Sequence, residues 1–236
     1  MKIKTGKKTM SSTLIILTRN EINGVISQLN KIPFSLFDEF FAIDYRSTDG
    51  TVEYFQKNNI PVIKQKRPGR AEAFNLGVRK SRGTYLVFFS PDGNEDPSDI
   101  YKLYKLLKNG FDLAIASRFL PHSRNEEDGK IFKFRAWANQ GFTFLANLFW
   151  NGHVTDSING YRAITKVAYN KLHLDAKGFA VEFQMTIRAL KLGMKIIEIP
   201  TKEGDRIGGS STSYAVPTGI KFLYYLIREL WIGKRF

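Results

Sequence analysis

The sequence contains no cysteine, only eight prolines among 236 residues, and no long uninterrupted hydrophobic stretch. The absence of cysteine excludes a disulfide-stapled scaffold, a thiolate metal site and a cysteine nucleophile. The two longest apolar stretches, 136–150 and 215–232, are interrupted by polar or charged residues, so neither is predicted to span a bilayer. The basic first residues are not followed by an apolar segment of about 7–15 residues, which a secretory signal would require. We interpret residues 1–11 as a basic tail.

Acidic residues are scarce relative to basic ones: 22 Asp and Glu stand against 36 Lys and Arg, which gives a net charge of +14. Such an excess favours polyanionic partners, namely nucleic acid, an anionic membrane surface or phosphorylated small molecules. A nucleic-acid-binding module is the less favoured alternative, because the basic residues are dispersed and no known recognition motif is present.

The first half of the chain alternates short apolar runs, rich in β-branched and aromatic residues, with stretches of helical period. This alternation predicts βαβ units and an α/β fold, Rossmann-like, with a mostly parallel sheet flanked by helices. Strands are predicted at 13–17, 39–43, 61–63, 85–89, 112–116 and 195–199, and helices at 21–29, 51–58, 70–80, 97–107, 131–150, 181–192 and 218–231. We divide the chain into the tail, one domain over residues 12–213, and a C-terminal amphipathic helix over residues 214–236.

Polar side chains follow the predicted strands at one edge of the sheet. Glu21, Asp44 and Asp92 come just after the first, second and fourth strands. Ligands of open α/β sheets bind at this edge, and clustered carboxylates need a cation or a ligand donor to offset their repulsion. We therefore interpret Asp44 and Asp92 as functional, whereas Asp49 and Asp96 are expected to cap the helices that follow them.

Seven segments, taken in order, resemble the signatures of family 2 glycosyltransferases of GT-A fold. They are residues 14–21 (LIILTRNE), 43–51 (IDYRSTDGT), 69–77 (GRAEAFNLG), 90–97 (SPDGNEDP), 116–119 (ASRF), 156–162 (DSINGYR) and 198–210 with its RIGGS ending. The chain is most similar to dolichol-phosphate and polyprenyl-phosphate mannosyltransferases and glucosyltransferases. The resemblance covers residues 12–213.

The resemblance implies a role for each matched residue. The nucleotide-sugar would contact Thr18, Asn20, Glu21, Asp44, Ser47, Arg70, Ser90, Asp92, Arg206 and Ser210. Asp92 and Asn94 would hold Mg²⁺ or Mn²⁺, and Arg118, Arg135 and Arg162 would bind a phosphorylated acceptor. The residues implied in catalysis are Asp92, Arg118 and Asp156.

Two positions depart from the family pattern. Ser90 replaces the first of two metal-binding aspartates, and Tyr45 replaces the second aspartate of the nucleoside motif. The loss of a carboxylate at position 90 predicts weaker metal binding.

The reaction implied is inverting, metal-dependent transfer of a hexose from a donor of the GDP-mannose or UDP-glucose type to a polyprenyl or dolichyl phosphate. A phosphate acceptor is already anionic, so it needs no strong base. The alternative is transfer to a soluble or polysaccharide hydroxyl, which needs a general base, and Asp156 is the candidate for that role.

The last helix predicts a peripheral membrane contact. Phe222, Leu223, Leu226, Ile227 and Leu230 share one helical face, and basic residues follow the helix. Together with the aromatic stretch 131–150, this helix is expected to hold the protein at a cytoplasmic membrane surface. The alternatives are packing against its own domain or a contact in a homo-oligomer.

Overall fold

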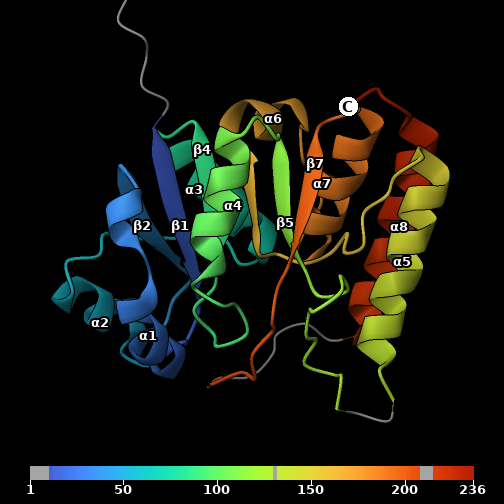
Figure 1. Ribbon diagram of the computed structural model, residues 1–236. Coiled ribbons are helices and arrows are strands. Elements are labelled where there is room, and N and C mark those ends of the chain that lie inside the picture. The colour runs from blue at the N-terminus through green and yellow to red at the C-terminus, as the bar shows by residue number, and fades with distance from the viewer. Residues whose placement is uncertain (1–10, 130–131, 208–214) are drawn as a thin grey trace, which may run out of the picture.

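Seven strands form one sheet in the order β3-β2-β1-β4-β6-β5-β7. The computed structural model describes residues 11–129, 132–207 and 215–236 (Figure 1). The strands are β1 (Ser12–Thr18), β2 (Glu39–Asp44), β3 (Val62–Lys64), β4 (Tyr85–Phe89), β5 (Leu113–Ser117), β6 (Arg162–Thr165) and β7 (Ile196–Pro200). The helices are α1 (Ile22–Gln28), α2 (Thr51–Lys57), α3 (Arg70–Lys80), α4 (Asp99–Lys108), α5 (Phe134–Trp150), α6 (Lys166–Lys171), α7 (Ala180–Lys191) and α8 (Ala215–Ile232), with short 3₁₀ turns at Leu29–Lys31 and Phe34–Leu36.

The sheet is parallel except for β6, which runs antiparallel between β4 and β5. The predicted class, an α/β fold with a mostly parallel sheet, is confirmed. The sequence pattern does not predict β6, because the segment has four residues and begins with a charged one, Arg162. That arginine is fully buried. A buried strand usually appears in the sequence as an apolar run, and the charged residue interrupts that signal here.

Helices cover both faces of the sheet, which explains why its central strands are apolar without alternation. Leu14 and Ile16 of β1 pack in a cluster with α1, α2 and α4, while Ile15 and Leu17 pack on the opposite face with α3, α6 and α7. All seven residues of β1 are buried.

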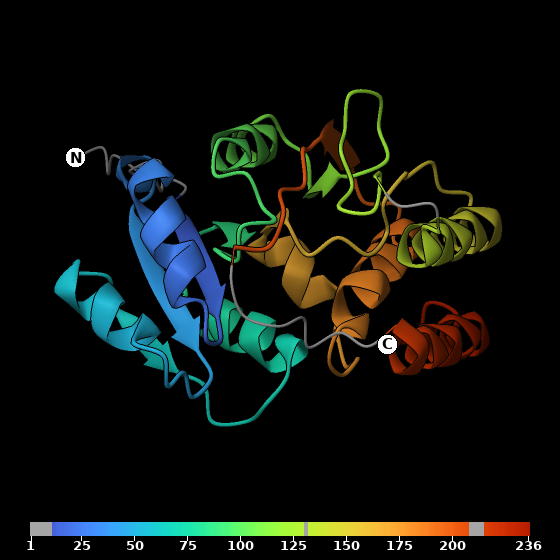
Figure 2. The same ribbon diagram turned by 90° about the horizontal axis from the view of Figure 1, so that it is seen from below.

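Helices α5 and α8 form an outer layer that packs against α7. They stand side by side at the right of both views (Figures 1 and 2). Phe222 and Leu226 of α8 join Phe183 and Ile187 of α7 and Ala146 of α5 in a third apolar cluster. The C-terminal helix is therefore packed into the domain.

The buried face of α8 differs from the predicted one. Phe222 and Leu226 are buried as expected, but Tyr225 and Glu229 are buried with them, whereas Leu223 and Ile227 are exposed. The physical reason lies on α7. Arg188 and Lys191 each form an ion pair with Glu229, which turns this carboxylate inward and leaves part of the apolar face outside.

The sheet has a topological switch point between β1 and β4. Strands β2 and β3 lie on one side of β1, and the chain then crosses to β4 on the other side. Loops after parallel strands diverge at such a point and leave room for a ligand. Figure 2 faces this edge of the sheet from below.

Candidate active site

An arginine joins the two sides of the switch point. Glu21 follows β1, Asp92 follows β4, and Arg206 bridges them from a distant part of the chain. The Arg206 Nη1 atom lies 3.0 Å from Asp92 Oδ2, and its other terminal nitrogen contacts Glu21 Oε1. Three residues implied in donor binding are thus in direct contact.

The segment that carries Arg206 is fixed to the loop after β4 by backbone hydrogen bonds. The amide of Ile207 donates to the carbonyl of Asp92 (3.0 Å), and that of Gly204 donates to the carbonyl of Asn94 (2.9 Å). Gly93 lies between these contacts with φ 98°, and a Cβ there would stand 2.8 Å from the Asp205 carbonyl oxygen. Glycine at position 93 therefore permits the close approach of the two segments.

The Glu21 carboxyl is electrostatically unusual. Burial raises its pKa from 4.5 to about 7, against the opposing attraction of Arg206. Its Oε2 atom is buried and has no hydrogen-bond partner in the described part of the chain. A buried acceptor without a partner is costly, and a ligand N–H or O–H group would relieve that cost.

We expect Glu21→Gln to change the pH dependence of stability. Between about pH 4.5 and 7 the folded protein holds a proton on Glu21 that the unfolded chain releases, so the free energy of unfolding falls as pH rises. Glutamine removes this term. As pH rises from about 4.5 to 7, the free energy of unfolding of the variant should therefore increase by up to about 3 kcal/mol relative to that of the parent protein. Urea denaturation at several pH values measures the difference, and a difference independent of pH would contradict the assignment.

Beside Glu21, hydrogen bonds connect the last residues of β1 and β2 with the loops that follow these strands. Asp44 is 2% exposed, and its carboxylate accepts hydrogen bonds from the backbone N–H (3.1 Å) and the hydroxyl of Ser47. Asn20 donates its backbone N–H to Ser47 Oγ (2.8 Å), and Thr18 Oγ1 lies 3.5 Å from Asp44 Oδ1. The residues implied in nucleoside binding thus form one connected group at the β1–β2 end of the site.

Arg70, at the start of α3, connects the β4 loop to α7. Its Nε atom forms an ion pair with the buried Glu182, and its Nη1 atom lies 3.4 Å from Ser90 Oγ. Although burial by itself lowers the pKa of Arg70, the Glu182 carboxylate raises it overall, so the guanidinium stays charged. Ser90 also donates its N–H to Glu95 (2.7 Å), a carboxyl whose pKa burial raises well above its usual value.

The second half of the site is built around Arg118, just after β5. Its guanidinium forms a bidentate pair with Asp156, with Nε–Oδ2 2.7 Å and Nη2–Oδ1 3.0 Å, and Glu203 lies 3.7 Å from Nη1. Asp156 is fully buried. Burial tends to raise the pKa of Asp156, but Arg118 outweighs that effect and holds it below the ordinary value. Asp156 is thus an ionised partner of Arg118.

The two remaining predicted acceptor arginines lie in different surroundings. Arg135, at the start of α5, is exposed and paired with Glu126 (2.7 Å). Arg162 is fully buried and donates to the carbonyls of Asn159 and Glu182, and burial lowers its pKa to about 10. The structure thus gives Arg162 no surface on which to contact an acceptor, and we assign it to the interior. Ser210 lies outside the described residues.

Sequence reasoning missed the acidic residues that hold the site together. Glu126 accepts from the side chain of Asn94 (3.0 Å), Glu203 accepts from the backbone of Glu126 (3.0 Å), and Glu182 pairs with Arg70. One signal was available for Glu203, because it lies just past the carboxyl end of β7, the same edge of the sheet at which Asp44 ends β2. Glu126 lies in a segment read only as a polar loop.

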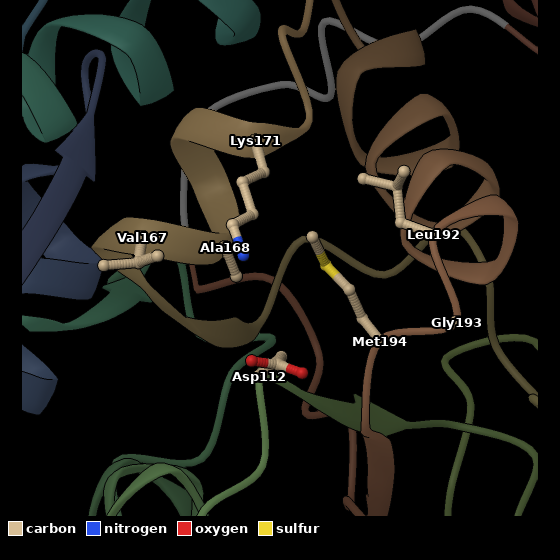
Figure 3. A pocket seen from close by; sticks show the side chains of 7 residues that line it. All are labelled: Asp112, Val167, Ala168, Lys171, Leu192, Gly193 and Met194. Carbon is tan, nitrogen blue, oxygen red and sulfur yellow. The ribbon is translucent and has the colours of Figure 1, made fainter. Parts of the chain in front are cut away.

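A separate hollow of about 270 Å³ lies at the opposite edge of the sheet (Figure 3). It is lined by residues before β5, on α6 and in the turn before β7: Asp112, Val167, Ala168, Lys171, Leu192, Gly193 and Met194. Since this edge carries the amino ends of β5 and β7, the hollow is not part of the site described above.

The arrangement of sheet and helices is shared with solved structures of the GT-A class. Glucosyl-3-phosphoglycerate synthase from Mycobacterium tuberculosis, crystallised with Mn²⁺, uridine diphosphate and phosphoglyceric acid, matches with a TM-score of 0.73. The match covers 96% of this chain and 79% of that chain at 20% sequence identity. The predicted GT-A fold is thereby confirmed.

Sequence comparison then defines the family. The family described as Glycosyl transferase family 2 matches residues 13–172. The chain belongs to this family and is a glycosyltransferase, as its motifs predict.

Two similar proteins have names that specify a lipid phosphate as their substrate. Dolichol-phosphate mannosyltransferase from Pyrococcus furiosus is 26% identical over 239 residues, which cover 95% of this chain and 65% of that protein. Undecaprenyl-phosphate mannosyltransferase from Micrococcus luteus is 27% identical over 210 residues, covering 84% of this chain and 85% of that protein. Glycosyltransferase AglJ from Haloferax volcanii is 25% identical over 83% of this chain. The chain spans less than two thirds of the length of the Pyrococcus and Haloferax proteins.

Proposed function

We propose that this protein transfers a hexose from a nucleotide-sugar to a polyprenyl phosphate, with inversion at the anomeric carbon. The observation that carries the proposal is the Arg118–Asp156 pair beside the switch-point site, because it supplies an oriented cation without supplying a base. That combination suits an acceptor that is already a phosphate anion. The named relatives that act on dolichol phosphate and undecaprenyl phosphate support the same acceptor class.

In this proposal the donor lies across the switch point. Asp44 and Glu21 accept hydrogen bonds from the nucleoside, while Arg206 and Arg70 face its diphosphate. Planar guanidinium groups suit phosphate oxygens because they donate two parallel hydrogen bonds. Binding of the diphosphate offers Arg206 an anionic partner in place of the two carboxylates that it now bridges.

The residues after β4 fit a divalent cation as partial ligands. Asp92 offers a carboxylate, and the amide nitrogen of Asn94 is engaged with Glu126 and Gly204, which leaves its oxygen as the remaining polar atom. In the described ranges no three acidic or histidine side chains gather into a complete metal site. A Mg²⁺ or Mn²⁺ ion would therefore depend on phosphate oxygens of the donor, as Mg²⁺ sites in proteins commonly do. The synthase that shares the fold was crystallised with each of these ions and uridine diphosphate.

The metal, when bound, would neutralise charge on the departing nucleoside diphosphate. The protein's own part is to orient the reactants. Arg118 holds an acceptor phosphate oxygen in line with the anomeric carbon. That oxygen forms the new bond as the bond to the diphosphate breaks, and no proton has to be removed.

A hydroxyl acceptor is the second candidate function, and one observation favours it. Glu203 lies 3.7 Å from Arg118, and burial raises its pKa, as is common for a general base. Asp156 does not suit that role, because it is buried and ion-paired.

Two variants separate the candidates. For a phosphate acceptor, Arg118→Gln should lower kcat/KM for polyprenyl phosphate by more than about tenfold, since a charge-assisted contact is lost. Glu203→Gln should lower it only a few-fold. For a hydroxyl acceptor the larger effect should come from Glu203→Gln. This variant should lower kcat/KM by about 10²-fold or more, the usual contribution of a general base. Initial rates on polyprenyl phosphate and on free sugars give both comparisons.

We further propose that the outer layer contacts a membrane peripherally. Its exposed apolar side chains include those of Phe134, Trp137, Phe144, Leu148, Ile220, Leu223, Tyr224, Ile227, Leu230 and Trp231, and we call these ten the apolar helix face. Trp and Tyr favour the headgroup region, and the exposed Lys221, Lys234 and Arg235 suit an anionic surface. No helix in the described ranges is both long and apolar enough to pass through a bilayer. Arg135 lies in the first turn of α5 and is linked to Asn94 through Glu126, so a lipid-borne phosphate would meet the site near this face.

A further inference from the structure

Glu198 on β7 has no role in the site described so far, yet its side chain reaches the segment between α5 and β6 that carries Asp156. Its Oε2 atom accepts hydrogen bonds from the backbone N–H (2.7 Å) and the hydroxyl (2.9 Å) of Thr155, and its Oε1 atom accepts from the backbone N–H of Asp156 (2.8 Å). Burial raises the pKa of this carboxyl, and the three donors oppose that rise. Because all three partners are donors, the ionised carboxylate is the form that fits them.

The first connection from Glu198 to Arg118 runs through Asp156. The backbone of Asp156 is held by Glu198, while its fully buried carboxylate forms the bidentate pair with the Arg118 guanidinium. The same carboxylate also accepts the backbone N–H of Arg118 (3.2 Å). A shift of the Asp156 backbone would therefore move the group that orients the guanidinium.

The second connection runs through hydroxyl groups to the end of β5. Thr155 Oγ1 lies 2.6 Å from the Oγ atom of Ser117, the residue directly before Arg118. The Thr155 hydroxyl gives its only proton to Glu198, so Ser117 must be the donor of this hydrogen bond. Ser117 Oγ in turn accepts the backbone N–H of Phe119 (3.1 Å). Glu198 thus fixes the direction of a hydrogen-bond chain that contacts the backbone on both sides of Arg118.

The same segment is also attached to α5, independently of Glu198. Asn147 accepts the backbone N–H of Val154 (3.1 Å) and donates to its carbonyl (2.7 Å). Thr143 Oγ1 accepts the backbone N–H of Ser157 (3.1 Å). The two residues between Val154 and Ser157 are those whose N–H groups Glu198 holds. A substitution of Glu198 is therefore expected to loosen these two residues while the segment stays in place.

We propose, building on the proposed function, that Glu198 is a positioning residue for the acceptor phosphate. It acts through Asp156 and Thr155 to fix Arg118 where the guanidinium can hold a phosphate oxygen in line with the anomeric carbon. Glutamine has a single acceptor oxygen, whereas both oxygens of Glu198 accept a backbone N–H, so in either orientation the amide nitrogen would face a donor. A displacement of about 1 Å in such a support can cost about 10²-fold in rate.

The test is a double-mutant cycle between Glu198→Gln and Arg118→Gln in the full chain. Initial rates are measured with polyprenyl phosphate varied at saturating GDP-mannose or UDP-glucose and Mn²⁺. We expect Glu198→Gln alone to lower kcat/KM for polyprenyl phosphate by about tenfold or more, with a raised KM for this acceptor and a donor KM within about twofold of the parent. In the Arg118→Gln background the same substitution should lower kcat/KM by less than about threefold, because Glu198 acts through Arg118.

The matched control is Glu39→Gln, at the start of β2 and the opposite edge of the sheet. Glu39 also accepts from a threonine hydroxyl, that of Thr13 (2.8 Å), and from a backbone N–H, that of Arg82 (2.7 Å). The substitution should leave kcat/KM within about twofold of the parent. It separates a role in positioning from the general loss of a carboxylate that holds two segments together.

A second pair of variants keeps the proposal testable if Glu198→Gln does not fold. Thr155→Val removes the hydroxyl chain and should lower kcat/KM for polyprenyl phosphate several-fold, whereas Thr155→Ser, which keeps the hydroxyl, should stay within about twofold of the parent.

An equal loss from Glu198→Gln in both backgrounds, or parent-like rates in Glu198→Gln or Thr155→Val, would overturn the positioning role alone. Parent-like kcat/KM in Arg118→Gln itself would overturn the proposed function together with it.

Discussion

Asp92→Asn is expected to lower kcat by about 10³-fold or more while the protein stays folded. Charge on the leaving diphosphate must be offset in the transition state, and removal of one such electrostatic group commonly costs about 10²–10³-fold. Asp92 is also the partner of Arg206, so the substitution disturbs both proposed cations of the donor site. Its side chain is 17% exposed and the loop is held by backbone bonds, so the fold should survive. Initial rates at saturating donor and Mn²⁺, with circular dichroism alongside, measure both effects.

Asp96→Asn is the matched control for this prediction. It lies four residues further along the same loop, and its carboxylate accepts from the N–H of Ser98 (2.9 Å) next to the start of α4. Its rate should stay within a few-fold of the parent. Ser90→Asp should act in the opposite direction and tighten Mn²⁺ binding, since it adds a hard oxygen ligand. An Asp92→Asn rate within tenfold of the parent would be inconsistent with the assigned role.

Glu229→Ala should destabilise the protein by about 3–5 kcal/mol, the cost of breaking a buried ion pair from one side. Glu229 is fully buried and accepts from Gln184 (2.8 Å), Arg188 (2.9 Å) and Lys191 (2.6 Å). Its loss leaves two buried cations on α7 without this partner. Urea denaturation measures the change. The same contacts indicate that removal of α8 would expose a core cluster of the domain.

Ile227→Ser is the control on the same helix, at an exposed position of the apolar helix face. It should change the free energy of unfolding by less than about 0.5 kcal/mol, as is usual for surface sites. If the face docks on a membrane, the double variant Ile227→Ser/Trp231→Ser should sediment less with anionic vesicles while staying folded. Unchanged sedimentation would contradict a membrane contact at this face. If the variant instead converted dimers to monomers, the face would be a contact between two copies of the protein.

The strands and helices of the first half were predictable because their signals are local. The strand at 13–17 is a run of apolar residues that both faces of the sheet bury, and its end marks the carboxyl edge. That rule alone places Glu21, Asp44 and Asp92 at one edge. The same rule cannot predict the contact between Asp92 and Arg206, because these two residues are 114 positions apart in the sequence.

The buried side of α8 could not be predicted from its own sequence. Helical periodicity places Phe222 and Leu223 on one apolar face, but the choice of buried side depends on α7. Arg188 and Lys191 supply cations that Glu229 neutralises, and this requirement competes with burial of Leu223 and Ile227. The same limit applies to Arg162, whose partners are interior carbonyls that no motif displays.

Transfer of labelled sugar to a lipid phosphate tests the central proposal most directly. The purified protein is incubated with Mn²⁺, radiolabelled GDP-mannose or UDP-glucose, and polyprenyl phosphate in anionic vesicles, and the lipid is then extracted. We expect label from one donor in the organic phase, released by mild acid as free sugar, and none when polyprenol replaces its phosphate or when Asp92→Asn replaces the parent. Label that passes equally well to polyprenol, or only to soluble hydroxyl acceptors, would contradict a polyprenyl-phosphate hexosyltransferase.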